Sequence, residues 1–331
     1  MSAMIYLDYQ ATTPTDGRVV EAMQPFHELE FGNPHSIQHS AGQSAAEAVE
    51  KARAQVAALI GADPREIVFT SGATESNNLA IKGAARFSLE HEGRDHIVTV
   101  ATEHKCVIES CRRLEREGIS VTYLPVEANG ALDMDRLAGA ITERTLMISV
   151  MAANNEVGIL APINEIGALA KDKGALFHTD AAQAVGKIAI DVAAAQIDLM
   201  SISGHKLYGP MGIGALYVRR RPRVRLIPLI DGGGQERGMR SGTLAPALCV
   251  GFGLACEISG REMAAEGERL AGMRDRLHQR LNRALPGVTL NGDLQNRLPG
   301  NLNLSFAGTD GTALIEALAR DICVSSGSAC T

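Results

Sequence analysis

The chain has 331 residues, with 32 Lys and Arg against 38 Asp and Glu and a formal net charge of −6. That length is sufficient for one large domain with a smaller companion, and for a core that needs no disulfide or metal to hold it. The negative balance predicts neither nucleic-acid contact nor attachment to anionic lipid. A small molecule or another protein is the expected partner.

Cysteine usage and the N-terminus indicate a compartment. The six cysteines form no CxxC pair and have no histidine nearby at zinc spacing, so we expect no metal site and no disulfide framework. The first residues lack the pattern of a signal peptide, and no run reaches the roughly 18 apolar residues of a membrane span. These features predict a protein of the reducing cytoplasm that is neither exported nor embedded in a membrane.

Short β-rich runs alternate with longer helical patterns through the first two thirds of the chain. Apolar residues recur at helical spacing in 45–61 and 163–174. The β-rich runs are 66–70, 96–100, 120–124, 145–151, 175–180, 197–203 and 212–218. This alternation predicts an α/β domain with a mostly parallel sheet.

A second unit follows the glycine-rich stretch 232–243. A long helical pattern runs to about residue 285, and strand-like segments come at 301–306 and 323–326. This order predicts a smaller α+β domain. We place the large domain at 15–260 and the small domain at 1–14 together with 261–331.

Ligands of an open parallel sheet bind beyond the carboxyl ends of its strands, so the residues that follow each run are the candidates for a binding site. Run 66–70 leads into SGATES, residues 71–76, directly before a helical pattern. Free backbone N–H groups at such a helix start can hold a phosphate. An ordinary serine or threonine N-cap explains the same residues without any ligand.

Two more strand ends carry titratable side chains. His104 follows run 96–100, and Asp180 ends run 175–180 with Gln183 three residues later. A lone histidine is more often structural than catalytic, and Asp180 is equally well explained as a helix N-cap. A buried aspartate is costly unless it meets a cation, however, and a pyridinium nitrogen would be such a cation.

The run 197–203 ends in Ser203 and is followed by Gly204, His205 and Lys206. By itself Lys206 would be interpreted as a solvated surface lysine. Next to a phosphate cradle and an aspartate suited to a pyridinium, it matches the requirements of pyridoxal phosphate chemistry. There a lysine amine binds the cofactor covalently, and an aspartate keeps the ring nitrogen protonated.

The segment DICVSSGSACT, residues 321–331, contains the cysteine of most interest. Cys330 follows Ser, Gly, Ser and Ala, a composition suited to an exposed mobile loop, and is interpreted as a reactive thiol. The other five cysteines lie in apolar or helical surroundings and are interpreted as packing residues. This interpretation has the least support for Cys323, which lies at the end of a strand-like run.

Taken together, nine segments resemble, in order and across the whole chain, those of the pyridoxal-phosphate-dependent cysteine desulfurases that supply sulfur for iron–sulfur clusters. They are YLDYQATTP, FGNPHS, FTSGATESNNLAIKG, TEHKCV, NNEVG, HTDAAQAVGK, SGHKLYGPMGIGALYVRR, GGGQERGMRSGT and SSGSACT. The resemblance implies the fold-type I architecture, as in aspartate aminotransferase, and a homodimer. It also implies L-cysteine as substrate and an iron–sulfur scaffold protein as sulfur acceptor.

The resemblance also implies roles for individual residues. Lys206 would hold the cofactor, His104 would stack on its ring and move protons, and Cys330 would take sulfur from L-cysteine as a persulfide. Asp180 would pair with the ring nitrogen, while Gln183 and Asn155 would contact the phenolic oxygen. The remaining implied cofactor contacts, mostly to the phosphate, are Ala73, Thr74, Ser203, His205 and, from the other subunit, Thr243.

One feature departs from the family. The sequence stops one residue after Cys330, whereas family members continue for several tens of residues and supply an arginine that binds the substrate carboxylate. Either the sequence represents a truncated or partial product, or the protein lacks that anchor and part of its small domain. We expect the former, because all upstream motifs are intact and small-domain strands would otherwise remain unpaired.

Two other functions fit parts of the pattern. A selenocysteine lyase or related β-lyase would use the same cofactor without needing Cys330, and an inactive protein could dock onto sulfur-accepting scaffolds without chemistry. A Rossmann-type dehydrogenase is set aside, because the chain has GIGALY but no GxGxxG between a first strand and its helix.

Overall fold

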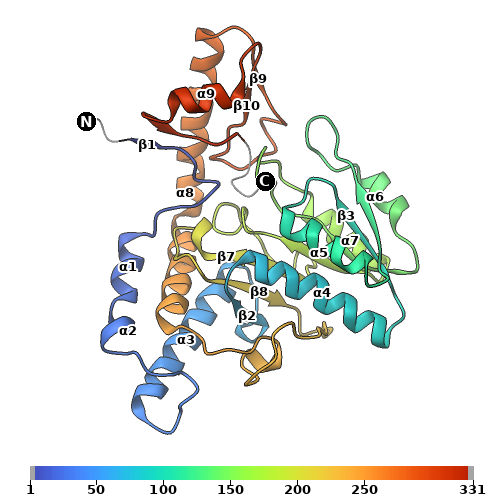
Figure 1. Ribbon diagram of the computed structural model, residues 1–331, viewed down its shortest axis with the longest axis vertical. Helices are drawn as coiled ribbons and strands as arrows, with labels where there is room; N and C mark the ends of the chain where they lie inside the picture. Colours follow the sequence, from blue (N-terminus) through green and yellow to red (C-terminus); the bar gives the residue numbers. More distant parts are fainter. Residues whose placement is uncertain (1–3, 327–331) are drawn as a thin grey trace.

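A seven-stranded sheet lies at the centre of the computed structural model, which describes residues 4–326 (Figure 1). Its strand order is β2-β8-β7-β6-β5-β3-β4, and β8 is antiparallel to both of its neighbours while the other pairs are parallel. The bounds are β2 Ile67–Thr70, β3 His96–Val100, β4 Ser120–Leu124, β5 Thr145–Ser149, β6 Leu176–Asp180, β7 Leu199–Ser203 and β8 Gly214–Val218. The predicted α/β class and its mostly parallel sheet are confirmed.

Helices cover both faces of this sheet. Along β2, Val68 packs into one buried cluster while Ile67 and Phe69 pack into the other, as the two-residue period of a strand requires. The cluster with Val68 includes side chains of α4 (Ala73–His91) and α5 (Lys105–Glu115). The opposite cluster includes side chains of α3 (Ser40–Leu59), α7 (Ile163–Asp172) and the first half of α8 (Pro246–Ala284). Burial on two faces explains why the strands read as continuous apolar runs.

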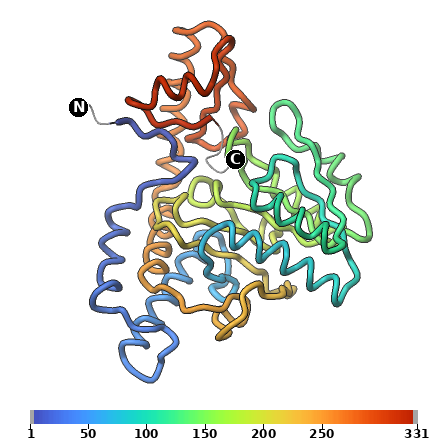
Figure 2. The backbone as a smooth tube through the Cα atoms, in the orientation of Figure 1, coloured from blue at the N-terminus to red at the C-terminus, as the bar shows by residue number. Residues whose placement is uncertain are grey.

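The smaller unit contains the two ends of the described chain. β1 (Ile5–Tyr6) pairs in parallel with β11 (Ile322–Cys323), and β9 (Val288–Leu290) pairs antiparallel with β10 (Leu304–Phe306). Figure 2 shows the first and last described segments, blue and red, side by side at the far end of α8. The remaining helices are α1 Gly17–Met23, α2 Pro25–Glu28, α6 Met134–Ala140 and α9 Gly311–Leu318, with short 3₁₀ turns at 64–66, 204–206 and 236–238.

The long helix α8 belongs to both units. Its buried residues all lie between Ala247 and Ser259, where it packs on the large sheet unit, whereas its C-terminal half is part of the smaller unit. A helix shared in this way fixes the two units to one another. The domain limits at 14/15 and 260/261 stay a prediction, because a continuous helix marks no boundary by itself.

The antiparallel strand β8 draws the ends of β2 and β7 together. Gly214, the first residue of β8, pairs with Thr70 on one side and with Ser203 on the other. A Cβ atom on Gly214 would lie 2.7 Å from the Cα of Gly72, so only glycine permits this approach. The start of α4 and the turn that carries Lys206 therefore flank the same glycine.

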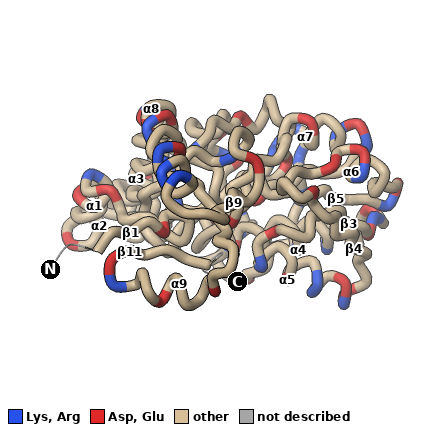
Figure 3. Tube along the Cα trace, turned by 90° about the horizontal axis from the view of Figure 1, so that it is seen from above, with Lys and Arg blue, Asp and Glu red and all other residues tan. Residues whose placement is uncertain are grey.

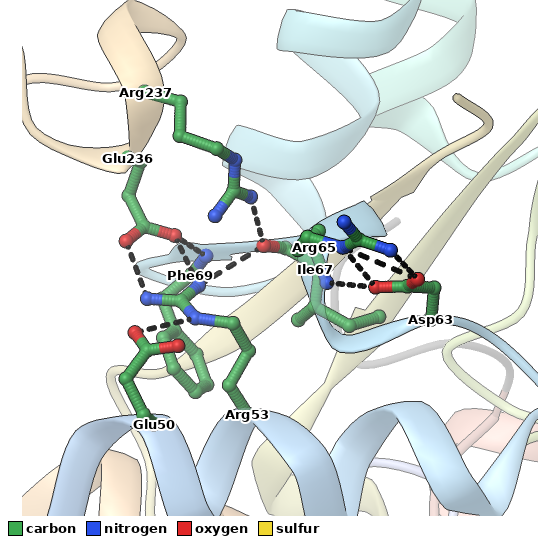
Figure 4. Close-up of polar contacts among 8 residues, drawn as sticks. All are labelled: Glu50, Arg53, Asp63, Arg65, Ile67, Phe69, Glu236 and Arg237. Carbon is green, nitrogen blue, oxygen red and sulfur yellow. Dashed lines mark hydrogen bonds and ion pairs between the residues drawn. The ribbon is translucent and has the colours of Figure 1, made fainter. Parts of the chain in front are cut away.

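Charged side chains stabilise the edge strand β2, as the close-up in Figure 4 shows. The N–H of Phe69 donates to Glu236 Oε2 at 2.6 Å, and the carbonyl of Ile67 accepts from Arg53 at 3.0 Å and from Arg237 at 2.5 Å. Arg53 and Glu236 also form a bidentate ion pair at 2.7 and 2.8 Å, with both side chains 3% exposed. Backbone groups that would be open to another strand are thus satisfied within the chain.

Most charged residues lie at the periphery. Figure 3 shows Lys and Arg interspersed with Asp and Glu on the outer helices, with the central elements mostly free of charge. Within residues 4–326 no helix combines the length and the apolar composition that crossing a membrane requires.

We expect Arg53→Met to lower the free energy of unfolding by about 3–5 kcal/mol, because it leaves Glu236 as an uncompensated buried charge. Arg65→Met is the matched control, since the Arg65–Asp63 pair in Figure 4 is solvent-exposed and contributes little. Urea denaturation followed by circular dichroism measures both. Equal losses for the two variants would contradict the role assigned to Arg53.

Candidate functional site

Lys206 lies in the 3₁₀ turn directly after β7, under a segment from the N-terminus of the chain. Its Nζ donates to the carbonyl oxygens of Gln10 and Ala11, the latter at 2.9 Å. Thr13 holds the same two segments together, because its hydroxyl donates to the carbonyl of His205 at 3.0 Å. The amine of Lys206 is therefore held at a defined position at the carboxyl edge of the sheet.

Asp180, the last residue of β6, is buried at that edge. Its Oδ2 accepts a hydrogen bond from Asn77 Nδ2 at 2.6 Å, and its Oδ1 accepts one from the N–H of Ala182 at 2.9 Å. Burial raises the pKa of the Asp180 carboxyl, while these hydrogen bonds and the nearby charges of His104 and Lys206 act in the opposite direction. A cation placed against this carboxylate would offset its desolvation.

His104 and Cys106 share the network around Asp180. His104 is the N-cap of α5, and its Nδ1 accepts from the N–H of Cys106 at 3.2 Å and contacts Cys106 Sγ at 3.0 Å. Asn77 Nδ2 donates to the same sulfur at 3.1 Å. Burial, followed by the charge of Asp180, raises the pKa of the Cys106 thiol to about 12. The raised pKa keeps the Cys106 thiol protonated within this polar network, and its interpretation as a packing residue stays a prediction.

Gln183 lies one turn beyond Asp180, beneath the N-terminal segment. Its Nε2 donates to the carbonyl of Gln10 at 2.9 Å, and its Oε1 accepts from Lys187 Nζ at 3.0 Å. Lys206 and Gln183 thus donate to one carbonyl oxygen. Asn155 is half-buried in the loop after β5, whose turn is fixed by Asn154 Oδ1 accepting two backbone N–H groups.

The residues predicted to bind phosphate meet around the start of α4. Gly72 is the N-cap, at φ 145°, and no side chain caps the helix there. Ala73 and Thr74 form the first turn, half-buried and exposed respectively, and Thr243 lines a cavity of about 90 Å³ with Ser71. Ser203 is buried at the end of β7, and His205 Nδ1 contacts Thr12 Oγ1 at 3.0 Å. The structure thus places Asp180, Gln183, His104 and Lys206 in one network, with Ser203 and His205 on the turn that carries Lys206. Within one subunit Asn155 and Thr243 show no contact with that network among the described residues.

These residues fit pyridoxal phosphate. The cofactor needs an amine, a carboxylate for its ring nitrogen and donors for its phosphate. Lys206, Asp180 and the uncapped start of α4 supply them from the carboxyl ends of β7, β6 and β2, with β8 between β7 and β2. Two buried acceptors at the edge, Asn77 Oδ1 and Gln10 Oε1, have no hydrogen-bond partner within residues 4–326. A polar ligand is the usual partner of such atoms.

Some functional residues were not identified from the sequence. Asn77 and Gln10 lie inside motifs that the sequence analysis quoted, but no pattern indicated that the first would contact Asp180 or the second Lys206. Lys187 and Glu103 are likewise brought to the site by the fold. Cys330, the predicted nucleophile, lies outside the described residues.

Comparisons with known proteins identify the family and the fold of the chain. The class-V aminotransferase family matches residues 5–331. The cysteine desulfurase IscS of Rickettsia rickettsii (strain Iowa) is 58% identical over 327 residues, which are 99% of this chain and 79% of the relative. A solved NifS-like protein superposes with a TM-score of 0.93 at 38% identity, covering 97% of this chain and 87% of that one.

A second solved structure, described as SspA in complex with cysteine, superposes with a TM-score of 0.85 at 39% identity, covering 98% of this chain and 90% of that one. Such agreement over nearly the whole chain confirms the fold-type I architecture expected from the sequence. The chain belongs to the class-V aminotransferase family and, within it, to the pyridoxal-phosphate-dependent cysteine desulfurases.

Proposed function

We propose that the protein is a cysteine desulfurase, which converts L-cysteine to L-alanine and delivers the sulfur to iron–sulfur scaffold proteins and other acceptors. The observation that carries the proposal is the 58% identity to an IscS cysteine desulfurase over 99% of the chain. The SspA structure, determined with cysteine, indicates the same substrate. Pyridoxal phosphate is the cofactor.

The cofactor would be held at the carboxyl edge of the sheet. Asp180 pairs with its ring nitrogen, His104 stacks on the ring, and Gln183 and Asn155 contact its phenolic oxygen. Its phosphate takes the helix start at Ala73 and Thr74, the side chains of Ser203 and His205, and Thr243 of the second subunit. When bound, pyridoxal phosphate withdraws electrons from the α-carbon of the substrate.

Three residues would carry the reaction. Lys206 would hold the cofactor covalently at rest and, once released by the substrate, would remove the α-proton. The thiolate of Cys330 would attack the substrate sulfur, so that an S–S bond forms while the Cβ–S bond breaks and its electron pair stays on carbon. Protonation of Cβ and return of a proton to the α-carbon, with His104 and Lys206 moving the protons, would give alanine and leave a persulfide on Cys330.

We also propose a homodimer in the cytoplasm, with the large domain at 15–260 and the small domain at 1–14 and 261–331. Large apolar side chains stand exposed within one segment after α2: Leu29 is 80%, Phe31 75% and Ile37 61% exposed. Apolar side chains gathered on one surface segment are typical of a surface that a partner covers. A second subunit there would also be the source of Thr243.

The test of the function is Cys330→Ser with L-cysteine as substrate. Alanine release is expected to fall at least about a thousandfold, because the nucleophile is lost, while the bound cofactor keeps its visible absorption. Cys323→Ser is the control and retains activity, since its half-buried thiol contacts Met4 in the smaller unit. Undiminished alanine release by Cys330→Ser, or turnover of selenocysteine alone, would favour a lyase that needs no thiol.

Asp180→Asn is expected to have opposite effects on function and stability. Alanine release falls about a hundredfold or more because the ring nitrogen loses its carboxylate partner. The cofactor-free variant is more stable than wild type at pH 8, because the raised pKa means that the folded state resists losing this proton. This gain in stability should disappear as the pH falls toward about 4, the pKa of an aspartate carboxyl in the unfolded chain. Urea denaturation at pH 8 and pH 4.5 measures the free energy of unfolding of both proteins. A stability difference between variant and wild type that is the same at both pH values would contradict the raised pKa of Asp180.

Phe31→Asp is expected to shift the protein from dimer to monomer, because it places a charge in the centre of the proposed interface. Sedimentation equilibrium at micromolar concentration measures the shift. Leu277→Asp is the control, since Leu277 is 43% exposed on the C-terminal half of α8. A Phe31→Asp protein that stays dimeric would place the interface elsewhere.

A further inference from the structure

A second lysine amine lies in the site, and the reaction described above makes no use of it. Lys187 follows Asp180 by seven residues and reaches back to Gln183, whose Oε1 accepts its hydrogen bond at 3.0 Å. The pKa of Lys187 is lowered to about 7, mainly by burial and to a lesser extent by repulsion from Lys206. The Lys187 side chain is half-buried, with its amine directed at the Gln183 amide instead of solvent.

The hydrogen bonds around Gln183 determine which way its amide points. An ammonium can only donate and a backbone carbonyl can only accept, so the Oε1 of Gln183 must face Lys187 and its Nε2 must face the carbonyl of Gln10. The reversed amide would place two donors together on one side and two acceptors together on the other. Lys187 therefore fixes Gln183 as a hydrogen-bond donor on the side where Lys206 also lies.

The charges that face Lys187 come from two other elements. Lys206 and His205 lie on the turn after β7, and Lys187 and Lys206 both lower the pKa of His205, behind the larger effect of its burial. Glu266 on α8 is the acidic neighbour, and it accepts a hydrogen bond from the hydroxyl of Tyr208 at 3.1 Å. Two amines with one carboxylate make this side of the site suited to an anionic oxygen.

We propose that Lys187 is a positioning residue for the cofactor: it orients Gln183 as a donor toward the anionic phenolic oxygen and, in its protonated form, adds positive charge beside Lys206. The proposal rests on the proposed function, because it requires pyridoxal phosphate at Lys206. It assigns to Lys187 no contact with substrate and no proton transfer. Its effect passes through the Gln183 amide and through the electrostatic potential at the Lys206 amine.

The experiment compares Lys187→Met, Lys187→Gln and Lys187→Arg with wild type by two measurements on protein loaded with pyridoxal phosphate. The first is the pH midpoint of the visible absorption change of the bound cofactor, and the second is the dissociation constant of pyridoxal phosphate. Lys82→Met is the matched control, because Lys82 donates to the amide of Asn78 at 2.6 Å with the same four-residue spacing, outside the Lys206 network.

Lys187→Met should raise the pH midpoint by about half a unit or more, because a cation and an oriented donor that disfavour protonation at Lys206 are both lost. It should weaken cofactor binding about fivefold, the typical effect of one misdirected hydrogen bond. Lys187→Gln keeps a neutral donor and should show a smaller shift, and Lys187→Arg should stay close to wild type. Lys82→Met should show no shift.

Two results would overturn the proposal and can be told apart. A wild-type protein that binds no pyridoxal phosphate removes the proposed function together with this inference. A wild-type protein that binds the cofactor normally, while Lys187→Met folds and shows the wild-type midpoint and affinity, removes only the role of Lys187.

Discussion

A carboxylate buried at the end of the central strand dominates the energetics of the site. Asp180 ends β6, the fourth of seven strands in spatial order, and its side chain is buried there. Desolvation penalises its charge, and one amide, one backbone N–H and the neighbouring cationic side chains offset only part of that penalty. The strand order therefore creates a position that strongly favours a bound cation. The protonated ring of pyridoxal phosphate is the cation that we propose for this position.

The antiparallel strand β8 determines which other groups can lie close to a cation bound at Asp180. Because β8 lies between β2 and β7, its first residue, Gly214, sits between the ends of both. The start of α4 after β2 and Lys206 after β7 are thus separated by one strand, β8, which lies about 5 Å from each of its two neighbours. The edge of β2 is held in turn by Glu236 and Arg53, far from Lys206 in sequence. A buried ion pair at the sheet edge thus supports the position of the helix start.

The strands and most of the site could be predicted from the sequence because both depend on local order. Runs such as 96–100 and 120–124 match their strands residue for residue. Both are rich in β-branched residues, which favour strands whether the strand is central, as β3 is, or at the sheet edge, as β4 is. Long-range contacts could not be predicted. The bond from Asn77 to Asp180 joins residues 103 positions apart, and that from Lys206 to Gln10 joins residues 196 apart, so no periodicity indicates either. The helix predicted at 45–61 in fact begins at Ser40, because His39 accepts from the N–H of Gly42 and caps it earlier than the apolar pattern suggests.

The N-terminal segment connects the chemistry of Lys206 to the smaller unit. Tyr6 in β1 pairs with Cys323 in β11, and four residues later the carbonyl of Gln10 receives both Lys206 and Gln183. The strand β11 continues in sequence toward Cys330. One pair of short strands therefore anchors both the segment that holds the lysine and the segment that leads to the proposed nucleophile. A change at Lys206 that displaced the Gln10 carbonyl would therefore pull on the β1–β11 pair, because only four positions separate Gln10 from Tyr6.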